Sequence, residues 1–334
     1  MILDGHSSAA VEQAVRTLAA GDLVGFPTET VYGLGADAGN DAAVAGIFAA
    51  KGRPSDHPLI VHVADAATVP RFASEVPAFA ARLMGAFWPG PLTLILPRRE
   101  GAGAAAAGGQ PSIGLRCPAH PVARALLQAC ARARPPIAGL AAPSANKFGR
   151  ISPTTAAHVQ AEFGDRLLVL DGGPCEVGIE SAIVDCTRGA PVLLRPGVLT
   201  PDQIAAACGQ PLRLQAELQQ PDQAAPRASG TLESHYAPRA SVRLMDAGSL
   251  QAALDLLGPQ APRIAVYSRA LLRAASTQVL MRRMPESAAE AARELFAALR
   301  DFDDAGVQLI WVETPPPGAQ WAGVSDRLQR AAVR

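Results

Sequence analysis

Residues 25–63 read GFPTETVYGLGADAGNDAAVAGIFAAKGRPSDHPLIVHV, and this stretch decides the fold of the first half of the chain. Two short apolar runs, at residues 23–26 and 59–63, are typical of buried strands. Between them the apolar positions at three- and four-residue spacing predict a helix over residues 41–50, with polar turns on either side. A strand, a polar turn, a helix and a second strand make a βαβ-like unit whose loops can present groups to a ligand.

The use of lysine singles out one residue in this stretch. The chain has 30 Lys plus Arg, and only Lys51 and Lys147 are lysines. A compact ammonium can enter between phosphate oxygens where a planar guanidinium cannot. The presence of Lys51 in a basic turn, in a chain that mostly uses arginine, therefore indicates an anion site at that turn. The alternative interpretation, that a lysine simply lies on a solvated face, is equally favoured for Lys51 and is the better one for Lys147.

Length, charge and cysteine content limit the possible classes of protein. At 334 residues the chain fits two domains. Its net charge is zero, which argues against nucleic acid as the main ligand. No apolar run reaches the length of a membrane span, and the first residues lack the pattern of a signal peptide, so we expect a cytoplasmic protein with no membrane partner. The 5 cysteines are never spaced as Cys-x-x-Cys, which indicates neither a disulfide framework nor a thiolate metal site.

The rest of the first half alternates predicted helices and strands. Helices are expected over residues 9–20, 69–87, 121–131 and 154–163, and strands over 92–96, 113–116, 136–140, 167–171, 180–185 and 192–194. The tract GAGAAAAGGQ at residues 101–110 has low complexity and is expected to form a flexible hairpin tip. We therefore assign residues 1–209 to one α/β domain, which we expect to be the catalytic domain.

A change of composition separates the second half. Residues 210–227 are rich in Pro, Gln and Asp with little periodicity, and ASGTLESHYAP follows at 228–238, so residues 210–238 are predicted to be a linker or lid. Beyond it, strands are expected at 242–245, 264–267 and 308–312, and helices at 250–257, 288–299 and from 323 onward. This pattern predicts a smaller, doubly wound α/β domain over residues 239–334.

Several common active-site motifs are missing from the sequence. It contains no P-loop, no Gly-x-Gly-x-x-Gly spacing, no Gly-x-Ser-x-Gly elbow and no histidine cluster at metal-ligand spacing. Instead, polar pairs follow separate short strands, and each pair alone is also explained as turn residues, caps or solvated charges. Together the pairs suggest a polar cavity of triphosphate size; they are Thr28/Thr30, Lys51/Arg53, Ser112/Arg116, Ser144/Asn146 and Ser181/Arg195.

Six motifs carry a resemblance to a known family. In chain order they are PTETVYGLG, KGRPSDHPLIVHV, SIGLRCP, APSAN, GIESAIVD and LLRPG, spread over roughly residues 10–200. Their order and spacing resemble the YrdC-like threonylcarbamoyl-AMP synthases, and HYAP at 235–238 followed by an α/β domain resembles the long, two-domain form. The resemblance implies a strongly twisted mixed sheet with a concave cavity, followed by a Rossmann-like domain.

The resemblance also implies an activity and its partners. A member of this family joins L-threonine, bicarbonate or CO2, and ATP into L-threonylcarbamoyladenylate and releases pyrophosphate. Mg2+ is expected to arrive with ATP and not through direct protein ligands. A separate transferase complex would then use the adenylate to form N6-threonylcarbamoyladenosine beside the tRNA anticodon; direct tRNA binding by this chain is left open.

Site residues follow from the resemblance position by position. Lys51 and Arg53 are expected to neutralise the triphosphate as catalytic cations, with Thr28 and Tyr32 as supports. The full ATP set is Lys51, Arg53, His57, Ser112, Ser144, Asn146, Ser152, Arg195 and His235. The threonine set is Thr30, His62, Arg116, Ala142 and Ser181, in which the Arg116 guanidinium has the right shape to pair with the carboxylate.

The sequence departs from the family pattern at three places. His57 stands where the family usually has Asn, Phe148-Gly149 follows the SAN triplet where Ser-Gly is usual, and ASGTLESHYAP matches the family linker only at Gly230, His235, Tyr236 and Pro238. A lid with altered contacts is therefore expected.

Two other functions are compatible with parts of the pattern. An RNA-binding or ribosome-associated module could use basic residues on a concave face, although the zero net charge disfavours it. Carbamoyl transfer for hydrogenase maturation uses a similar module, but the zinc-finger cysteines of those larger proteins are missing from this sequence.

Overall fold

The computed structural model describes residues 1–217, 226–230 and 236–333. The chain divides into two compact units. The first comprises residues 1–148 and 152–231, and the second comprises residues 149–151 and 232–334. Gly149, Arg150 and Ile151 thus group with the second unit although both of their chain neighbours belong to the first.

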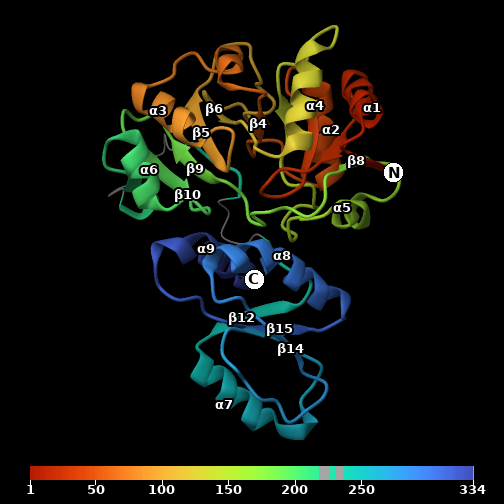
Figure 1. Ribbon diagram of the computed structural model, residues 1–334, viewed down its shortest axis with the longest axis vertical. Helices are drawn as coiled ribbons and strands as arrows, with labels where there is room; N and C mark the ends of the chain where they lie inside the picture. Colours follow the sequence, from red (N-terminus) through yellow and green to blue (C-terminus); the bar gives the residue numbers. More distant parts are fainter. Residues whose placement is uncertain (218–225, 231–235, 334) are drawn as a thin grey trace. The chain divides into compact units, whose positions relative to one another are not determined.

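The first unit is built on one mixed sheet, whose strands and flanking helices form the upper part of Figure 1. The strand order is β1-β8-β2-β3-β7-β4-β6-β5-β9-β10-β11. The strands are β1 (Ile2–Asp4), β2 (Val24–Phe26), β3 (Gly33–Asp37), β4 (Ile60–His62), β5 (Leu92–Pro97), β6 (Ser112–Arg116), β7 (Leu140–Ala141), β8 (Leu168–Asp171), β9 (Ala182–Asp185), β10 (Val192–Arg195) and β11 (Arg213–Leu214). The helices are α1 (Ser8–Ala19), α2 (Asp41–Lys51), α3 (Ala78–Phe87), α4 (Pro121–Arg132), α5 (Ala156–Phe163) and α6 (Pro201–Cys208). The expected mixed α/β class is confirmed.

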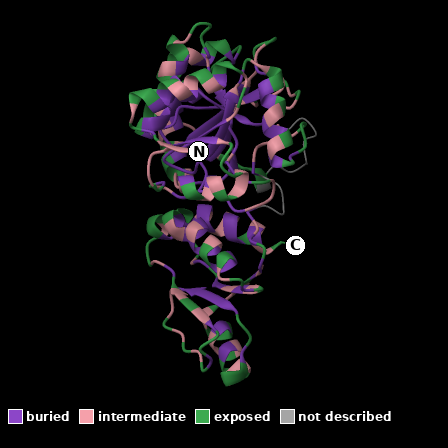
Figure 2. Ribbon diagram, turned by 90° about the vertical axis from the view of Figure 1, so that its right-hand side faces the viewer, coloured by how far each residue is buried: buried purple, intermediate pink, exposed green. Residues whose placement is uncertain are grey.

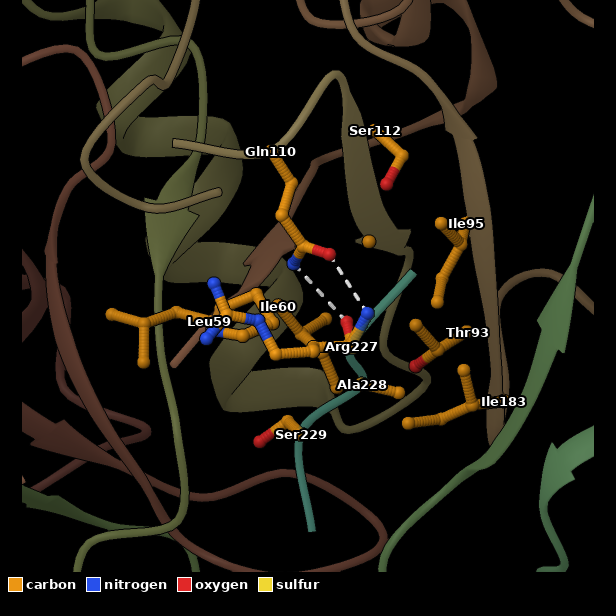
Figure 3. Close-up of a pocket in the computed structure, with 12 residues that line it drawn as sticks. Leu59, Ile60, Thr93, Ile95, Gln110, Ser112, Ile183, Arg227, Ala228 and Ser229 are labelled. Atoms are coloured by element: carbon orange, nitrogen blue, oxygen red, sulfur yellow. Dashed lines mark hydrogen bonds between the residues drawn. The ribbon is translucent and has the colours of Figure 1, made fainter. Parts of the chain in front are cut away.

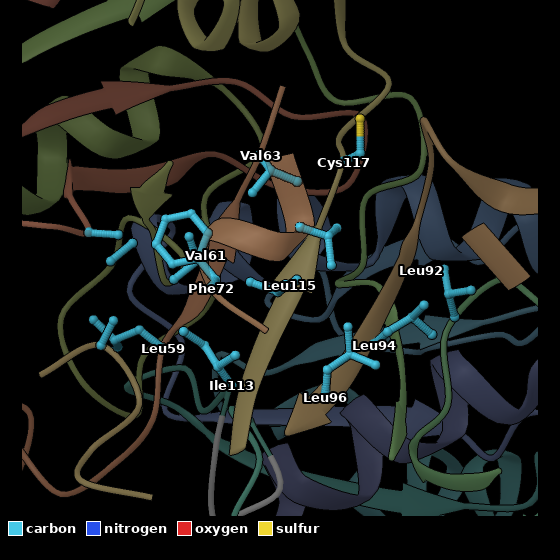
Figure 4. Close-up of a cluster of buried hydrophobic side chains, with 14 of the residues drawn as sticks. Leu59, Val61, Val63, Phe72, Leu92, Leu94, Leu96, Ile113, Leu115 and Cys117 are labelled. Atoms are coloured by element: carbon cyan, nitrogen blue, oxygen red, sulfur yellow. The ribbon is translucent and has the colours of Figure 1, made fainter. Parts of the chain in front are cut away.

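Alternation along β4, β5 and β6 separates a core face from a polar face. Successive side chains of a strand point to opposite faces of the sheet. The core face carries Leu59, Val61, Val63, Leu92, Leu94, Leu96, Ile113 and Leu115, which pack with Phe72 (Figure 4). The intervening positions include His62, Thr93, Ser112 and Arg116. The same period-2 pattern that builds the core therefore gathers polar side chains on the other face, where they flank a small apolar cluster that includes Ile60, Ile95 and Ile183.

Most strand residues of this unit are buried, as Figure 2 shows in purple. The tract 101–110 shares in this burial: Ala106 and Ala107 are inaccessible to solvent, and the Leu59 amide donates to the Ala106 carbonyl at 2.7 Å. The tract is the tip of the antiparallel β5–β6 hairpin, as expected, but it is packed against the domain and not a free tip. Small alanines let this connection pack closely against Leu59, the residue just before β4.

Two further expectations for the first unit need correction. The helix predicted over residues 69–87 is two pieces, a 3-10 turn at Ala66–Arg71 and α3, because Pro70 and Pro77 interrupt it. The polar turn after β2 contains strand β3, which pairs antiparallel with β2. Its Gly-Leu-Gly-Ala-Asp sequence carries little strand propensity, and burial between β2 and β7 outweighs this.

The second unit is a four-stranded sheet within the part of the chain described, ordered β12-β15-β13-β14, and all of its pairs are parallel. Its elements are β12 (Ser241–Met245), α7 (Ala247–Leu257), β13 (Ala265–Ser268), β14 (Leu280–Arg283), α8 (Ala288–Asp304), β15 (Leu309–Glu313) and α9 (Ala322–Ala332). Helices α8 and α9 cover one face and α7 the other, so the expected doubly wound fold is confirmed (Figure 1). Strand β14 was not predicted from the sequence, because LMRR ends in two arginines and lacks an apolar run. It lies at the edge of the sheet. No helix in the described ranges has the length and apolar content needed to span a bilayer.

Candidate active site

Most of the polar residues expected to form a site are buried in the first unit, whereas His57 and Ser144 are half-buried. Buried polar groups of this kind need partners, because desolvation without compensation is costly. The set with less than a tenth of its surface exposed is Thr28, Thr30, Lys51, Arg53, His62, Ser112, Arg116, Asn146, Ser152, Ser181 and Arg195. Such a concentration of buried cations and hydroxyls on one sheet is typical of a binding site and not of an ordinary core.

Arg116, at the end of β6, is held by three acceptors. Its Nη2 pairs with the Glu29 carboxylate at 2.6 Å, its Nη1 donates to the Thr30 hydroxyl at 2.8 Å, and its Nε donates to the Gly90 carbonyl at 3.2 Å. The second Glu29 oxygen accepts the Ala119 amide at 3.0 Å. The guanidinium is therefore fixed in orientation, and its remaining N–H groups can receive a carboxylate.

His62 lies beside Arg116, because strands β4 and β6 place the two residues in register. Burial, and then the Arg116 charge, lower the pKa of His62 to about 3. The imidazole is therefore neutral at physiological pH, and its Nδ1 has no hydrogen-bond partner among the described residues. A neutral ring with an unused nitrogen can accept or donate one hydrogen bond to a small polar ligand.

Lys51 is the last residue of α2, and its ammonium turns toward the loop that follows β7. Its Nζ donates to the Ser144 carbonyl at 2.6 Å and also to the Asn146 carbonyl. Burial, and then the nearby Arg53 charge, hold the pKa of Lys51 well below its usual value. An anion placed here would relieve both effects, which is the behaviour of a phosphate site.

Arg53, Phe148 and His57 form a second group beside Lys51. The Arg53 guanidinium lies 5.7 Å from the Phe148 ring centroid and donates to the Pro58 carbonyl at 3.0 Å. His57 packs edge-on against the same ring at 5.6 Å, and burial followed by the Arg53 charge lowers the pKa of His57. Phe148, a departure from the family pattern, thus supports the two basic side chains that flank the turn.

The other expected residues lie in two further groups. The Ser181 hydroxyl bonds with that of Thr93 at 2.7 Å, and Arg195 donates through Nε to the Ser181 carbonyl at 3.0 Å. Ser152 donates to the buried Glu180 carboxylate. His235 lies outside the described residues.

Backbone contacts connect the Lys51 and Arg116 groups. The Ala145 amide, in the Ser144–Asn146 loop, donates to the Tyr32 carbonyl at 2.8 Å, and the Ala142 amide donates to the Ile60 carbonyl at 2.9 Å. Tyr32 is itself fixed by hydrogen bonds of its hydroxyl to Asp171 and to the Gly173 carbonyl. The two groups thus belong to one framework of adjacent loops.

The segment 227–229 lies over the polar sheet face (Figure 3). The Gln110 side-chain amide accepts the Arg227 backbone N–H at 2.7 Å and donates to the Arg227 carbonyl at 3.2 Å, and the Arg195 Nη1 donates to the Ser229 carbonyl at 2.7 Å. The cavity left beneath, lined by Ser112 and Thr93 among others, has about 10 Å³, room for one water molecule. In this conformation the segment covers this part of the sheet face.

Three residues of the site were missed from the sequence. Glu29 lies inside the PTETVYGLG motif but was not assigned a role, although the motif itself was a signal. Thr93 faces the site because it alternates with Leu92 and Leu94 of the core. Glu180, which accepts the Ser152 hydroxyl, stands at the polar start of the predicted strand 180–185.

Known proteins resemble this chain over both units. A family model of the Sua5, YciO and YrdC proteins, described as "Telomere recombination", matches residues 16–197, and a model of the threonylcarbamoyl-AMP synthase C-terminal domain matches residues 199–333. The threonylcarbamoyl-AMP synthase of Pyrococcus abyssi is 36% identical over 319 residues, covering 93% of this chain and 91% of the relative. That of Bacillus subtilis is 37% identical, with 96% and 92% covered. A crystal structure of P. abyssi Sua5 complexed with L-threonine matches with a TM-score of 0.86 at 35% identity, covering 96% of this chain and 94% of that one.

Proposed function

Because this chain belongs to the threonylcarbamoyl-AMP synthase family, we propose that it joins L-threonine, bicarbonate and ATP into L-threonylcarbamoyladenylate and releases pyrophosphate. The observation that carries the proposal is the presence of two buried cationic groups, at the end of β6 and at the end of α2, in one framework of adjacent loops. Arg116 is oriented by Glu29 and Thr30, and Lys51 is aimed at the Ser144–Asn146 loop. One group suits an amino-acid carboxylate and the other a triphosphate.

The chemistry requires a nucleophile, an electrophilic phosphorus and a leaving group. The threonine amine attacks CO2 formed from bicarbonate, loses a proton and becomes a carbamate. A carbamate oxygen then attacks the α-phosphorus of ATP, and pyrophosphate leaves with the electron pair of the broken P–O bond. Negative charge gathers on the phosphate oxygens during this step, so fixed cations in a site shielded from water stabilise it.

Each group of residues takes one part of this work. Lys51 and Arg53 neutralise the triphosphate, while Ser144, Asn146 and Ser112 offer hydrogen bonds to it. Arg116 receives the threonine carboxylate, and the neutral His62 and the Thr30 hydroxyl lie beside that position. Arg195 and Ser181 lie where the 227–229 segment approaches the sheet, which makes them contacts to the nucleotide and to the edge of the threonine pocket.

Mg2+ enters this scheme with ATP. The ion usually keeps several waters and is bound through substrate phosphates plus one or two protein oxygens. The hydroxyl of Ser144 and the side-chain amide of Asn146 would hold a water molecule of the Mg2+ shell by hydrogen bonds. The ion would supply charge neutralisation at the phosphates.

The segment 227–229 must leave the sheet face before a nucleotide can occupy it. We therefore include gating by this segment in the proposal, supported by the small residual cavity and by the Gln110–Arg227 hydrogen bonds. The segment is part of the expected 210–238 linker, of which residues 218–225 and 231–235 lie outside the described residues. The product, a mixed carbamic-phosphoric anhydride, is reactive, and a covered site would limit its hydrolysis. A tRNA threonylcarbamoyl-transferase complex is the proposed consumer of the product.

Isotope-labelled bicarbonate tests the reaction directly. The purified protein is incubated with ATP, Mg2+, L-threonine and 13C-bicarbonate, and the products are separated by rapid chromatography and mass spectrometry. The proposal predicts an adenylate that contains both threonine and one 13C atom. If ATP is consumed only to AMP or ADP without any threonine-containing adenylate, another reaction is catalysed.

A further inference from the structure

Asp303, near the end of α8, is a buried carboxylate that fastens two separate segments of the second unit. Its Oδ2 accepts the Arg239 amide at 2.8 Å and the Arg150 Nη2 at 3.3 Å, and its Oδ1 accepts the Ala240 amide at 3.1 Å. The Asp303 side chain is only 5% exposed, whereas that of the next residue, Asp304, is 79% exposed. Hydrogen bonds of a buried carboxylate to a guanidinium and to amides are individually strong.

The first of these segments is Gly149–Ile151. Two contacts besides the Arg150–Asp303 pair hold it: the Ala237 amide donates to the Gly149 carbonyl at 2.9 Å, and the Arg300 guanidinium donates to the Ile151 carbonyl. Every residue of this network belongs to the second unit. The chain neighbours of the segment, Phe148 and Ser152, belong to the first unit.

The second segment, Arg239–Ala240, follows immediately on the Tyr236–Pro238 end of the linker. One carboxylate thus holds both the residues that leave the Ser144–Asn146 loop and the residues that end the linker. Neither segment contributes a side chain to the site groups described above. The role of Asp303 must therefore be indirect.

Covalent continuity connects the first segment to the triphosphate site. Arg150 lies four residues after Asn146, and between them the Phe148 amide donates to the Lys51 carbonyl at 2.9 Å. The Phe148 ring supports Arg53, and the Ser144 and Asn146 carbonyls accept the Lys51 ammonium. The 149–151 segment is therefore the direct covalent continuation of the loop that supplies these carbonyls and this ring.

We propose that Asp303 is a positioning residue for ATP: by holding Arg150, it fixes the exit of the 144–148 loop that orients Lys51 and Arg53. The inference rests on the proposed function, in that it takes the Lys51 group to be the ATP site. It gives the second unit a specific task in the reaction. Because Arg116, His62 and Thr30 lie on other elements, threonine binding depends little on Asp303.

Steady-state kinetics of the full-length enzyme test this inference. Asp303→Ala is expected to raise the KM for ATP about tenfold, the equivalent of about 1.4 kcal/mol, with the KM for threonine changed less than about twofold. Asp303→Asn, which keeps an acceptor for the backbone amides but loses the charge, should give a smaller rise. Asp304→Ala is the matched control and should behave as wild type. Equal increases in both KM values, or a loss of kcat alone, would overturn the inference.

A double-mutant cycle shows whether Asp303 acts through Arg150. Arg150 is 36% exposed, so Arg150→Ala is expected to fold even if Asp303→Ala does not. Arg150→Ala should raise the KM for ATP, and adding Asp303→Ala should raise it by much less than the product of the two single effects. If the increases in the KM for ATP of the two single variants multiply in the double variant, Asp303 does not act through Arg150, and the inference is wrong.

Hydrogen exchange provides a readout that needs no activity. In Asp303→Ala, amides of residues 144–151 should exchange at least several-fold faster, while amides in the middle of α8 keep their protection. Unchanged exchange in 144–151, or uniform acceleration through α8, would show that Asp303 serves only the stability of the second unit. If the wild type released no pyrophosphate, the proposed function would fail, and this experiment would still decide whether Asp303 holds the loop.

Discussion

The Arg116 guanidinium and the Glu29 carboxylate form an ion pair at 2.6 Å in which both side chains are almost fully buried. The pair joins the loop after β2 to the end of β6, and the second Glu29 oxygen extends the connection to Ala119. Removing one partner of such a pair leaves an uncompensated buried charge. Glu29 therefore orients the arginine that we assign to the threonine carboxylate.

Replacement of Glu29 should weaken threonine binding more than ATP binding. In Glu29→Gln, the Arg116 guanidinium loses its charged partner and its fixed direction, so the KM for threonine is expected to rise about tenfold or more. The free energy of unfolding should fall by about 3 kcal/mol in urea denaturation. Glu12→Gln, at an exposed ion pair with Arg16, is the control and should change neither quantity appreciably. An unaltered KM for threonine in Glu29→Gln would contradict the assignment of Arg116 to the threonine carboxylate.

ATP binding should be accompanied by proton uptake at Lys51. Because burial lowers the pKa of Lys51 in the ligand-free enzyme, part of the population is neutral at alkaline pH, and the triphosphate charge raises the pKa again on binding. Calorimetric titration of ATP at pH 9 in buffers of different ionisation enthalpy should show more protons taken up by wild type than by Lys51→Met. If both proteins take up the same number of protons, Lys51 does not contact the triphosphate.

The buried His62 should make the fold less stable in mild acid. Its folded-state pKa of about 3 lies below the value of about 6.5 in the unfolded chain, so the unfolded state binds the proton first as the pH falls. The stabilising contribution is complete above pH 6.5 and is lost progressively between pH 6.5 and about 3, amounting to about 2 kcal/mol by pH 5. The decline in unfolding free energy from pH 7 to pH 5 should be smaller in His62→Gln by this amount. Parallel pH profiles would show that His62 is accessible to protons in the folded state.

Loosening the contact between Gln110 and Arg227 should ease access to the site. Gln110→Ala removes both hydrogen bonds that hold the 227 backbone over the sheet, so the fraction of enzyme with an open face should increase. The apparent affinity for a ligand rises with the fraction of competent conformers, and we expect the KM for ATP to fall about threefold. Gln128→Ala, at an exposed position of α4, should have no effect. A higher KM for ATP in Gln110→Ala would mean that the contact belongs to the ATP-bound conformation.

Much of the fold could be predicted because it depends on local periodicity. Short apolar runs in residues 59–63 and 92–96 indicated β4 and β5, and the helical spacing of residues 41–50 indicated α2. Strand β3 and the close packing of the 101–110 tract could not be predicted, because glycine and alanine carry little periodicity and these segments are ordered by long-range burial. Tertiary packing outweighs local preference at both places.

Some residues of the candidate site could be predicted from the sequence, and others could not. Lys51, Arg53 and Arg116 stood out as cations in motif loops. Glu29 and Thr93 did not, because their partners, Arg116 and Ser181, lie 87 and 88 residues away in sequence. The Gly149–Ile151 segment grouped with the second unit for the same reason: its contacts with α8 have no counterpart in the local sequence.

Threonine-dependent pyrophosphate release is the most direct test of the central claim, that Lys51 and the Arg116 group serve one adenylate-forming reaction. The purified protein is assayed with ATP, Mg2+ and bicarbonate, with and without L-threonine, beside Lys51→Ala. We predict release that requires threonine and is lost in Lys51→Ala. Release that is the same without threonine at every bicarbonate concentration, or that survives in Lys51→Ala, would contradict the account.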